Sequence, residues 1–277
     1  MTKIANLSLN DGQRIPPIGF GTNVLRGRKG VDSILTALDA GYRLIDTAQS
    51  YDNEEIVGAA VAESSVPRQE LVLTTKITDA HQGYQQTLDS FEVSLAKLKT
   101  DWVDILLVHW PNVQDFERSL ETWRALIDLQ QAGKVTTIGV SNYTPDLLQR
   151  TIDASGMVPA LNQVEFHPFL VQKDLLAYCQ QKEIRIEAYC PIARAERAGH
   201  PVLQQLAAKY QKSPVQIMLR WHVELGIIPI PRSENPDHIR ANFQIFDFSL
   251  EEDEVREISG LNENYRIIKP DKSPPGW

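Results

Sequence analysis

Four polar side chains of this sequence could together deliver a proton to a carbonyl oxygen. Each stands at or just beyond the end of a short apolar run: Asp46, Tyr51, Lys76 and His109. A free phenol ionises near pH ~10 and is a weak acid at neutral pH, but a neighbouring ammonium stabilises the phenolate. We therefore expect Lys76 to lower the pKa of Tyr51 and make it a general acid. Asp46 would hold Lys76 in place, and His109 would orient the carbonyl by a hydrogen bond.

Taken singly, each of these residue types has a commoner structural role. An Asp in such a loop more often caps a helix, a Lys is more often solvated, and a His after an apolar strand more often bonds a backbone carbonyl. What favours catalysis is their joint placement, because the carboxyl ends of parallel strands meet on one rim of a barrel.

The elements that would position them are strands separated by helices, since apolar runs of four to eight residues alternate with longer amphipathic segments. We predict strands at Pro17–Phe20, Tyr42–Ile45, Leu71–Thr75, Val103–Val108, Thr137–Val140, Leu161–Val164, Arg185–Tyr189 and Ile227–Pro229. We predict helices at Gly30–Ala40, Asn53–Ser64, Gln85–Leu98, Phe116–Gln131, Pro145–Ala154, Leu170–Lys182, Val202–Tyr210, Pro214–Leu225, Pro236–Phe243 and Leu250–Leu261. Before them, Ile4–Leu9 and Gln13–Ile15 flank a turn sequence and predict a small antiparallel hairpin.

Eight strands with helical crossovers favour an α/β fold of the (β/α)8 TIM-barrel type, with the hairpin closing its bottom. An open doubly wound sheet usually carries a G-x-G-x-x-G turn after its first strand, and none occurs here. The sequence contains no internal repeat or linker, so we expect residues 1–277 to form a single domain.

Composition narrows the partners and the compartment. The formal net charge of -8 argues against nucleic acid as a partner. Two cysteines, Cys179 and Cys190, cannot build a disulfide framework, and the first ten residues contain no apolar signal core. No run of 18 apolar residues occurs, so we expect a cytoplasmic protein without a membrane segment.

Around the four polar residues, the chain strongly resembles the aldo-keto reductase superfamily. The matching segments, in the family's order, are Gly19–Thr22, Asp46–Glu54, Thr74–Lys76, His109–Pro111, Ile138–Asn142, Asn162–Glu165 and Ile230–Ser233. The resemblance covers nearly the whole chain. It implies a barrel that binds extended NADPH without a Rossmann unit and reduces aldehydes and ketones. Tyr51 would be the acid, Lys76 and Asp46 its tuning pair, and His109 the residue that orients the substrate.

The same resemblance implies the residues that contact the cofactor. For the nicotinamide carboxamide these are Ser141, Asn142 and Gln163, with Tyr189 stacking on the ring. The loop that passes over the pyrophosphate comprises Cys190, Pro191 and Ile192, where the family usually has Ser at position 190. Further cofactor positions are Gly21, Thr22, Asn23 and Asn242.

The 2′-phosphate of NADPH would be bound by residues that follow the eighth predicted strand. Arg232 and Ser233 precede a helix start at Asn235, where unpaired N–H groups and the helix dipole favour an anion. Many relatives have Lys at position 232 and Arg at position 238, whereas a histidine such as His238 is mostly neutral at pH 7. Glu234 adds a carboxylate that would repel phosphate or accept from a ribose hydroxyl. We expect NADPH, with dual use of NADH as a further hypothesis.

The sequence indicates fewer residues for the substrate pocket than for the cofactor site. Asn23 replaces a Trp that is common in the family, Trp110 remains as a wall, and Ser50 is a small neighbour of the acid. Short loops resemble the bacterial branch that includes 2,5-diketo-gluconate and methylglyoxal reductases, which implies small polar carbonyls, dicarbonyls, keto-sugar acids and aldehydes as substrates. Trp277 is a candidate to fold over the pocket, and a monomer is the default expectation.

Two other classes of function stay open. One is a non-catalytic barrel that binds nicotinamide nucleotide as a sensor or subunit. The other is a metal-dependent hydrolase that would use His109 and Asp46 as ligands, although the clustered second and third histidines of such a site are missing from the sequence. We therefore expect no metal.

Overall fold

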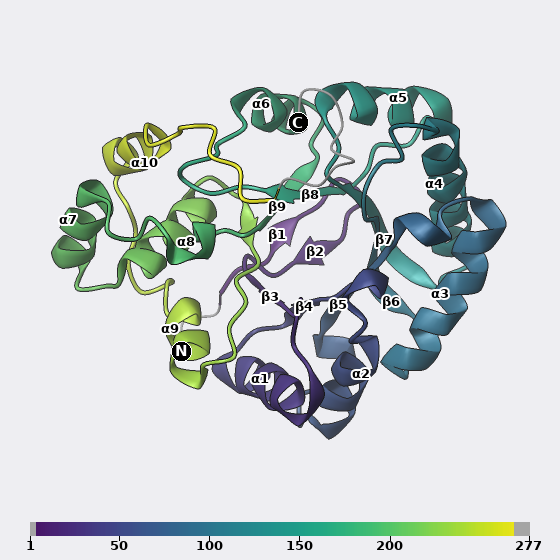
Figure 1. Ribbon diagram of the computed structural model, residues 1–277, viewed down its shortest axis with the longest axis horizontal. Helices are drawn as coiled ribbons and strands as arrows, with labels where there is room; N and C mark the ends of the chain where they lie inside the picture. Colours follow the sequence, from purple (N-terminus) through teal and green to yellow (C-terminus); the bar gives the residue numbers. More distant parts are fainter. Residues whose placement is uncertain (1–3, 269–277) are drawn as a thin grey trace.

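The computed structural model describes residues 4–268, and within them eight parallel strands form one sheet in sequence order (Figure 1). The strands are β3 Gly19–Gly21, β4 Leu44–Asp46, β5 Val72–Ile77, β6 Val103–Val108, β7 Val135–Ser141, β8 Leu161–Glu165, β9 Arg185–Tyr189 and β10 Ile228–Pro229. The helices around them are α1 Gly27–Ala40, α2 Glu54–Glu63, α3 Tyr84–Leu98, α4 Phe116–Gln131, α5 Pro145–Ser155, α6 Lys173–Gln181, α7 Pro201–Tyr210, α8 Pro214–Glu224, α9 Pro236–Phe243 and α10 Glu252–Ser259. Short 3-10 turns are η1 Gln49–Tyr51, η2 Arg68–Glu70, η3 Asp79–His81 and η4 Ala193–Ala195.

The sheet curls until its first strand reaches the end of its last. The backbone N–H of Gly21 donates to the carbonyl of Pro231 at 3.0 Å. The approach is close because Gly21 has no side chain: a Cβ there would lie 3.3 Å from the carbonyl oxygen of Ile230. This contact makes a nearly closed barrel, and the prediction of a (β/α)8 fold is confirmed.

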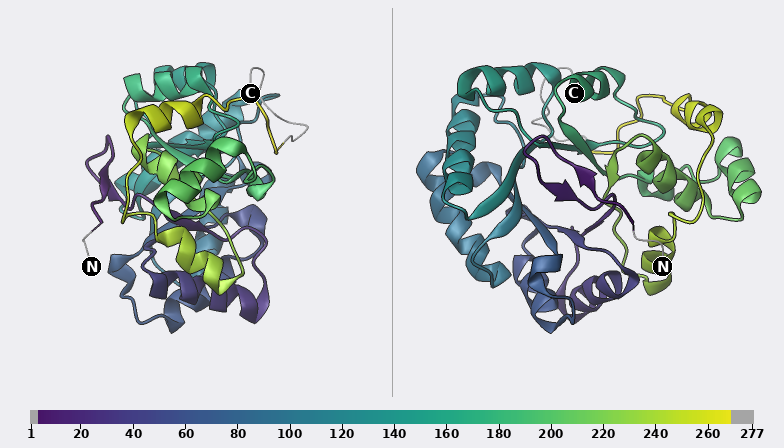
Figure 2. Two further views of the ribbon diagram at one scale, coloured as in Figure 1. Left: turned by 90° about the vertical axis from the view of Figure 1, so that its left-hand side faces the viewer. Right: turned by 180° about the vertical axis from the view of Figure 1, so that it is seen from behind.

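The hairpin β1 Leu7–Ser8 and β2 Arg14–Ile15 is antiparallel and projects at one end of the barrel (Figure 2). Ile15 joins a buried apolar cluster that fills this end of the barrel interior. Thr137 Oγ1 also donates to Asp11 Oδ2 in the turn at 2.8 Å. The predicted hairpin therefore closes the end of the barrel where the strands begin.

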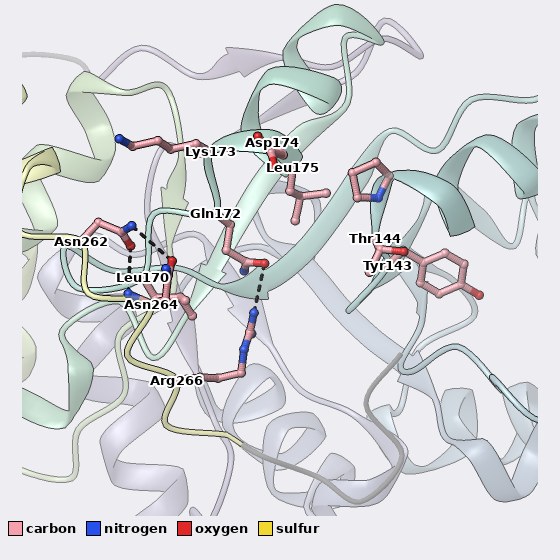
Figure 3. Close-up of a pocket in the computed structure, with 11 residues that line it drawn as sticks. Tyr143, Thr144, Leu170, Gln172, Lys173, Asp174, Leu175, Asn262, Asn264 and Arg266 are labelled. Atoms are coloured by element: carbon pink, nitrogen blue, oxygen red, sulfur yellow. Dashed lines mark hydrogen bonds between the residues drawn. The ribbon is translucent and has the colours of Figure 1, made fainter. Parts of the chain in front are cut away.

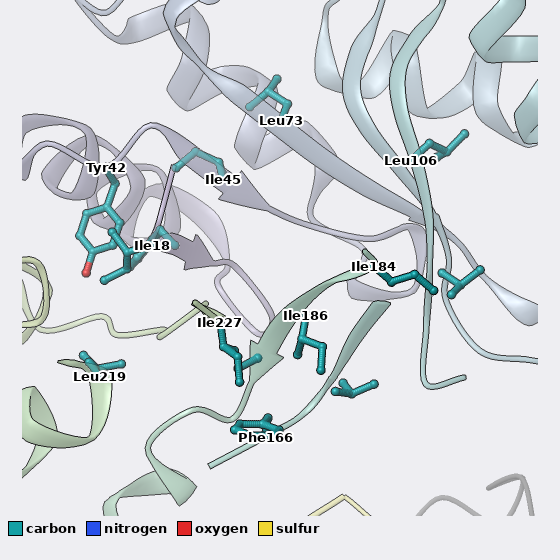
Figure 4. Close-up of a cluster of buried hydrophobic side chains, with 14 of the residues drawn as sticks. Ile18, Tyr42, Ile45, Leu73, Leu106, Phe166, Ile184, Ile186, Leu219 and Ile227 are labelled. Atoms are coloured by element: carbon teal, nitrogen blue, oxygen red, sulfur yellow. The ribbon is translucent and has the colours of Figure 1, made fainter. Parts of the chain in front are cut away.

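The core has two layers because successive residues of a strand point to opposite faces. Ile45, Leu73, Leu106 and Ile186 face the helices and belong to the larger cluster (Figure 4). Burying each such side chain contributes about 1.5–3 kcal/mol. The alternate positions face the barrel interior, which is apolar where the strands begin and polar where they end.

Several predicted boundaries match the structure, including those of β6, β9, α4 and α9. Thr144, Ser213 and Asn235 cap α5, α8 and α9 by accepting backbone N–H bonds, each before a proline. The helix predicted from Leu170 instead begins at Lys173. Leu170 is held in a turn in which its backbone and that of His167 exchange two hydrogen bonds.

Between residues 4 and 268, no helix is long and apolar enough to cross a membrane. Trp277 lies outside the described residues.

Candidate active site

The four polar residues predicted to act together meet at the carboxyl ends of the strands. Asp46 is the last residue of β4, Lys76 lies near the end of β5, and His109 directly follows β6. Tyr51 ends the short turn η1, which starts three residues after β4. This turn is fixed locally, because the N–H of Tyr51 bonds the carbonyl of Ala48 at 3.0 Å.

Lys76 is the centre of the group and is fully buried. Its Nζ donates to Asp46 Oδ1 at 2.7 Å, to the carbonyl of Thr47 at 2.8 Å and to Tyr51 Oη at 3.3 Å. An ammonium has three donors, so all three are used. Since Lys76 donates to the phenol oxygen, the phenol's own hydrogen is free to donate elsewhere.

The expected lowering of the pKa of Tyr51 is wrong for this structure. Burial raises the pKa of Tyr51, and the opposing effect of the Lys76 ammonium does not cancel it; the Asp46 carboxylate adds to the rise. Burial alone would lower the pKa of Lys76, but Asp46 and Tyr51 outweigh it and the pKa is raised. At neutral pH the site therefore holds a protonated phenol beside a charged ammonium.

His109 is neutral in this setting. Burial holds its pKa well below the usual value, and the charge of Lys76 lowers it further. A neutral imidazole has one nitrogen that donates and one that accepts. Nδ1 lies 3.2 Å from Ser50 Oγ, and no described residue bonds Nε2. If Ser50 donates, the proton resides on Nε2.

The ends of β7, β8 and β9 bring the predicted nicotinamide residues to the same rim. Ser141 Oγ donates to the carbonyl of Gln163 at 2.7 Å. Asn142 Nδ2 donates to the carbonyl of His109 at 2.9 Å, and Tyr189 Oη donates to Asn142 Oδ1 at 2.8 Å. One hydrogen-bond network thus links three strand ends to the backbone of the histidine.

Glu187 was missed in the sequence. It lies in β9 with no exposed surface, and Gln163 Nε2 donates both to Glu187 Oε2 at 3.1 Å and to Asp46 Oδ2 at 2.8 Å. The signal was the alternation of polar and apolar residues in Arg185–Tyr189, which turns the charged positions of this strand into the barrel.

The predicted phosphate residues form a separate exposed group at the start of α9. Arg232 and His238 are exposed, and Asn235 Oδ1 accepts from the backbone N–H groups of Asp237 and His238. Glu234 pairs with Lys29 of α1 at 2.8 Å, and this bond lowers the pKa of the carboxyl. The sequence did not indicate the pairing, because the partners are 205 positions apart.

The other predicted residues lie around the same rim. Thr22 Oγ1 donates to the carbonyl of Asp46 at 2.9 Å, which ties β3 to β4 next to Lys76. Burial raises the pKa of Cys190 to about 11, so this half-buried thiol stays protonated. The remaining positions are the buried Pro191 and Asn242, the half-buried Ile192, Trp110 and Ser233, and the exposed Asn23 and Ser50.

A cavity of about 500 Å³ opens beside this rim, between the starts of α5 and α6 and the segment that follows α10 (Figure 3). Arg266 crosses it and donates to Gln172 Oε1 at 3.3 Å. None of the four central polar residues lines this cavity. In the described part of the chain, no three His, Cys, Asp or Glu side chains cluster to hold a metal ion.

Comparison with known proteins agrees with this geometry. The Aldo/keto reductase family model matches residues 17–263. The chain is 46% identical over 262 residues to 2,5-diketo-D-gluconic acid reductase B of Corynebacterium sp. (strain SHS752001), covering 94% of each protein. It is 43% identical to a crystal structure of an aldo/keto reductase from Brucella melitensis, with a TM-score of 0.91, covering 94% of this chain and 100% of that one.

A further structure is the Bombyx mori aldo-keto reductase in complex with NADP, at 35% identity and a TM-score of 0.89, covering 97% of this chain and 96% of that one. The family match spans most of the chain, including the barrel strands and the four central residues. The chain therefore belongs to the aldo/keto reductase family of oxidoreductases.

Proposed function

We propose that this chain reduces small polar aldehydes and ketones to alcohols with NADPH, and that Tyr51 supplies the proton. The observation that carries the proposal is the buried ammonium of Lys76, which donates hydrogen bonds to both Asp46 Oδ1 and Tyr51 Oη. A carbonyl oxygen that gains negative charge during reduction needs a proton donor within hydrogen-bond reach. Tyr51 meets this need because, among residues 4–268, its hydroxyl only accepts a hydrogen bond, from Lys76, and its own hydrogen is not used.

The role of Lys76 follows from the order of events. Before transfer the phenol is neutral, and its raised pKa keeps the proton in place. Once the proton leaves, the phenolate lies 3.3 Å from an ammonium that stabilises it. An interaction that strengthens as the reaction proceeds accelerates it, whereas uniform binding does not.

His109 would orient the carbonyl through Nε2. The hydroxyl of Ser50 can donate to Nδ1, which places the ring proton on Nε2, the nitrogen that no described residue occupies. The ring packs edge-on against Tyr51 with centroids 5.6 Å apart. A single carbonyl oxygen could then accept from both Tyr51 and His109, which would fix its orientation.

The residues around the rim fit a nicotinamide nucleotide. Gln163 Oε1 accepts no hydrogen bond from the described residues. We assign the carboxamide to Ser141, Asn142 and Gln163, the ring to Tyr189, and the pyrophosphate loop to Cys190–Ile192. When bound, the reduced nicotinamide supplies the hydride.

At the adenosine end we assign the 2′-phosphate to Arg232, Ser233 and His238, with Asn242 nearby on α9. The Bombyx mori relative, which was solved in complex with NADP, supports this choice. The Lys29–Glu234 pair also supports it, because a carboxylate already bonded to a lysine repels a phosphate less. Dual use of NADH remains part of the proposal.

The substrate class rests on the pocket mouth and on one relative. Asn23 and Ser50 are exposed and Trp110 is half-buried. We assign Asn23 and Ser50 to the mouth of the substrate pocket and Trp110 to its apolar wall. The Corynebacterium relative is named for 2,5-diketo-D-gluconic acid, which is a keto-sugar acid. We propose dicarbonyls, keto-sugar acids and small aldehydes as substrates. We also propose that residues 1–277 act as one domain, as a monomer, in the cytoplasm.

The test is the loss of reduced-nicotinamide absorbance when the protein is mixed with NADPH and a dicarbonyl, a keto-sugar acid or an aldehyde. We expect turnover by the wild type and a fall in kcat of at least about 100-fold in Tyr51→Phe, with the Kd for NADPH unchanged. Tyr84→Phe is the matched control, because the hydroxyl of this exposed side chain donates to Asp128 on the surface. NADPH binding without turnover of any carbonyl would favour the sensor alternative.

A further inference from the structure

We propose that Glu187 is a positioning residue for the cofactor: together with Asp46 it holds the amide of Gln163 so that the amide oxygen faces the nicotinamide carboxamide. This inference rests on the proposed binding of NADPH. It concerns a buried carboxyl group for which the reaction itself has no use.

The geometry fixes the orientation of the Gln163 amide. Nε2 lies 2.8 Å from Asp46 Oδ2 and 3.1 Å from Glu187 Oε2. Asp46 Oδ2 belongs to the carboxylate that pairs with Lys76 and would repel an amide oxygen in this place, whereas Asp46 Oδ2 and Glu187 Oε2 can both accept from an amide N–H. The nitrogen must therefore point between the two carboxyl groups, and the oxygen must point away from them.

Glu187 has little structural reason to be charged. It has no exposed surface, and no described cation pairs with it. Oε1 has no hydrogen-bond partner among residues 4–268. An apolar side chain at position 187 would extend the cluster of Leu161 and Ile228 at a lower cost of burial.

The pKa of Glu187 is affected by burial and by the charges of Asp46 and Lys76. Burial raises the pKa of Glu187 to about 7, and the Asp46 carboxylate of β4 adds to the rise. The hydrogen bond from Gln163 of β8 and the charge of Lys76 of β5 lower the pKa. The group is thus half-ionised near neutral pH, and in either state its carboxyl oxygen can accept from Gln163.

The amide of Gln163 is thus pre-organised for binding the cofactor. The carboxamide of nicotinamide offers N–H donors, and Gln163 Oε1, which already points away from Asp46 and Glu187, can accept one of them without rotating. If Glu187 is replaced by a side chain without an acceptor, Gln163 loses one of its two bonds and its amide can turn. One such hydrogen bond corresponds to a change of up to about 10-fold in binding.

The experiment compares two substitutions of similar size. Glu187→Met removes the acceptor, and Glu187→Gln keeps a carbonyl oxygen that can accept from Gln163. We expect the Kd for NADPH, measured by quenching of protein fluorescence, to rise about 10-fold in Glu187→Met and less than about 3-fold in Glu187→Gln. The Kd for 2′,5′-ADP, which contains no nicotinamide, should stay unchanged in both.

A double-mutant cycle tests the route through Gln163. Gln163→Met should weaken NADPH binding about as much as Glu187→Met, and the double substitution should weaken it no further, because the two residues act as one unit. Additive losses would overturn the proposal. An equal rise of both Kd values in Glu187→Met would also overturn it, because that result indicates a general structural role.

A second measurement applies if Glu187→Met does not fold. The Kd for NADPH is measured as a function of pH for Glu187→Gln and for the wild type. Because the nucleotide phosphates titrate equally in both measurements, their effect cancels in the ratio of the Kd of Glu187→Gln to that of the wild type. An ionised carboxyl accepts more strongly than a neutral one, so this ratio should rise as pH increases through about 7. A flat ratio overturns the inference. Failure of the wild type to bind NADPH would refute the proposed function and this inference with it.

Discussion

Replacing Lys76 by Met should lower both the stability and the activity of this protein, and the two effects can be separated. Lys76 is fully buried, and the side chain of its partner Asp46 is 5% exposed. Met fills a similar volume but has no charge, so Asp46 would remain as a buried carboxylate without its cation. Breaking a buried ion pair from one side costs about 3–5 kcal/mol.

The same change should reduce catalysis for a different reason. Tyr51 would lose the ammonium 3.3 Å from its oxygen, and the phenolate formed by proton transfer would have no charge partner. General acid catalysis contributes about 10²–10⁴-fold, so kcat should fall within that range. The assay is the rate of reduced-nicotinamide loss at saturating NADPH, with urea unfolding followed by circular dichroism for stability.

The double variant Lys76→Met, Asp46→Asn distinguishes the two effects. Removing both charges relieves the buried carboxylate, so the free energy of unfolding should return to within about 1 kcal/mol of the wild type. The activity should stay low, because the phenol still lacks its cation. Recovery of kcat in the double variant would refute the electrostatic role of Lys76.

Lys134→Met is the matched control. Lys134 forms an ion pair with Glu92 on the surface, where both side chains are largely exposed. Exposed pairs contribute about 0–1 kcal/mol, so this variant should keep its stability and its kcat. If Lys76→Met changed the free energy of unfolding as little as Lys134→Met, the buried Lys76–Asp46 pair would not stabilise the fold as argued above.

Further outcomes are expected at three places: Ser50, the Lys29–Glu234 pair and Glu187. Ser50→Ala should lower kcat/KM about 10-fold and move the proton of His109 partly from Nε2 to Nδ1, as seen in nitrogen-15 NMR of the ring. Glu234→Gln should tighten NADPH binding about 2- to 5-fold at low salt, with a smaller gain at high salt, and Lys29→Ala should weaken NADPH more than NADH in competition assays. Because the pKa of Glu187 is raised from 4.5 to about 7, its contribution to stability is present below pH ~4.5 and lost as pH rises through 7. Relative to Glu187→Gln, the wild-type free energy of unfolding should therefore fall by about 3 kcal/mol over that interval in urea titrations.

The parts of the fold that the sequence predicted well are those with local causes. The bounds of α4 match because apolar periodicity defines that helix within its own segment, and those of α9 match because Asn235 caps its start before a proline. The first strand was predicted at Pro17–Phe20 but spans Gly19–Gly21. Its ends depend on pairing with β4 and on the contact of Gly21 with Pro231, and neither is visible in the local sequence.

The same division applies to the site. That Asp46, Lys76 and His109 share a rim could be predicted, because each lies at or just beyond the carboxyl end of a parallel strand. The direction of the pKa shift of Tyr51 could not, because it depends on burial by residues distant in the sequence. The contact of Gln163 with Asp46, across 117 positions, likewise depends on closure of the barrel, whereas its contact with Glu187 follows from the register of the neighbouring strands β8 and β9.

The raised pKa of Tyr51 means that the phenol is fully protonated in the resting protein. A cation that lowered this pKa to neutrality in the resting protein would leave part of the phenol ionised and unable to donate. Here burial keeps the proton on Tyr51, and in the proposed reaction Lys76 would stabilise the phenolate only as it forms. Asp46 supports this arrangement by keeping Lys76 charged in a buried place. In the proposed reaction this stabilisation would therefore act mainly in the transition state, where an interaction raises kcat rather than merely tightening substrate binding.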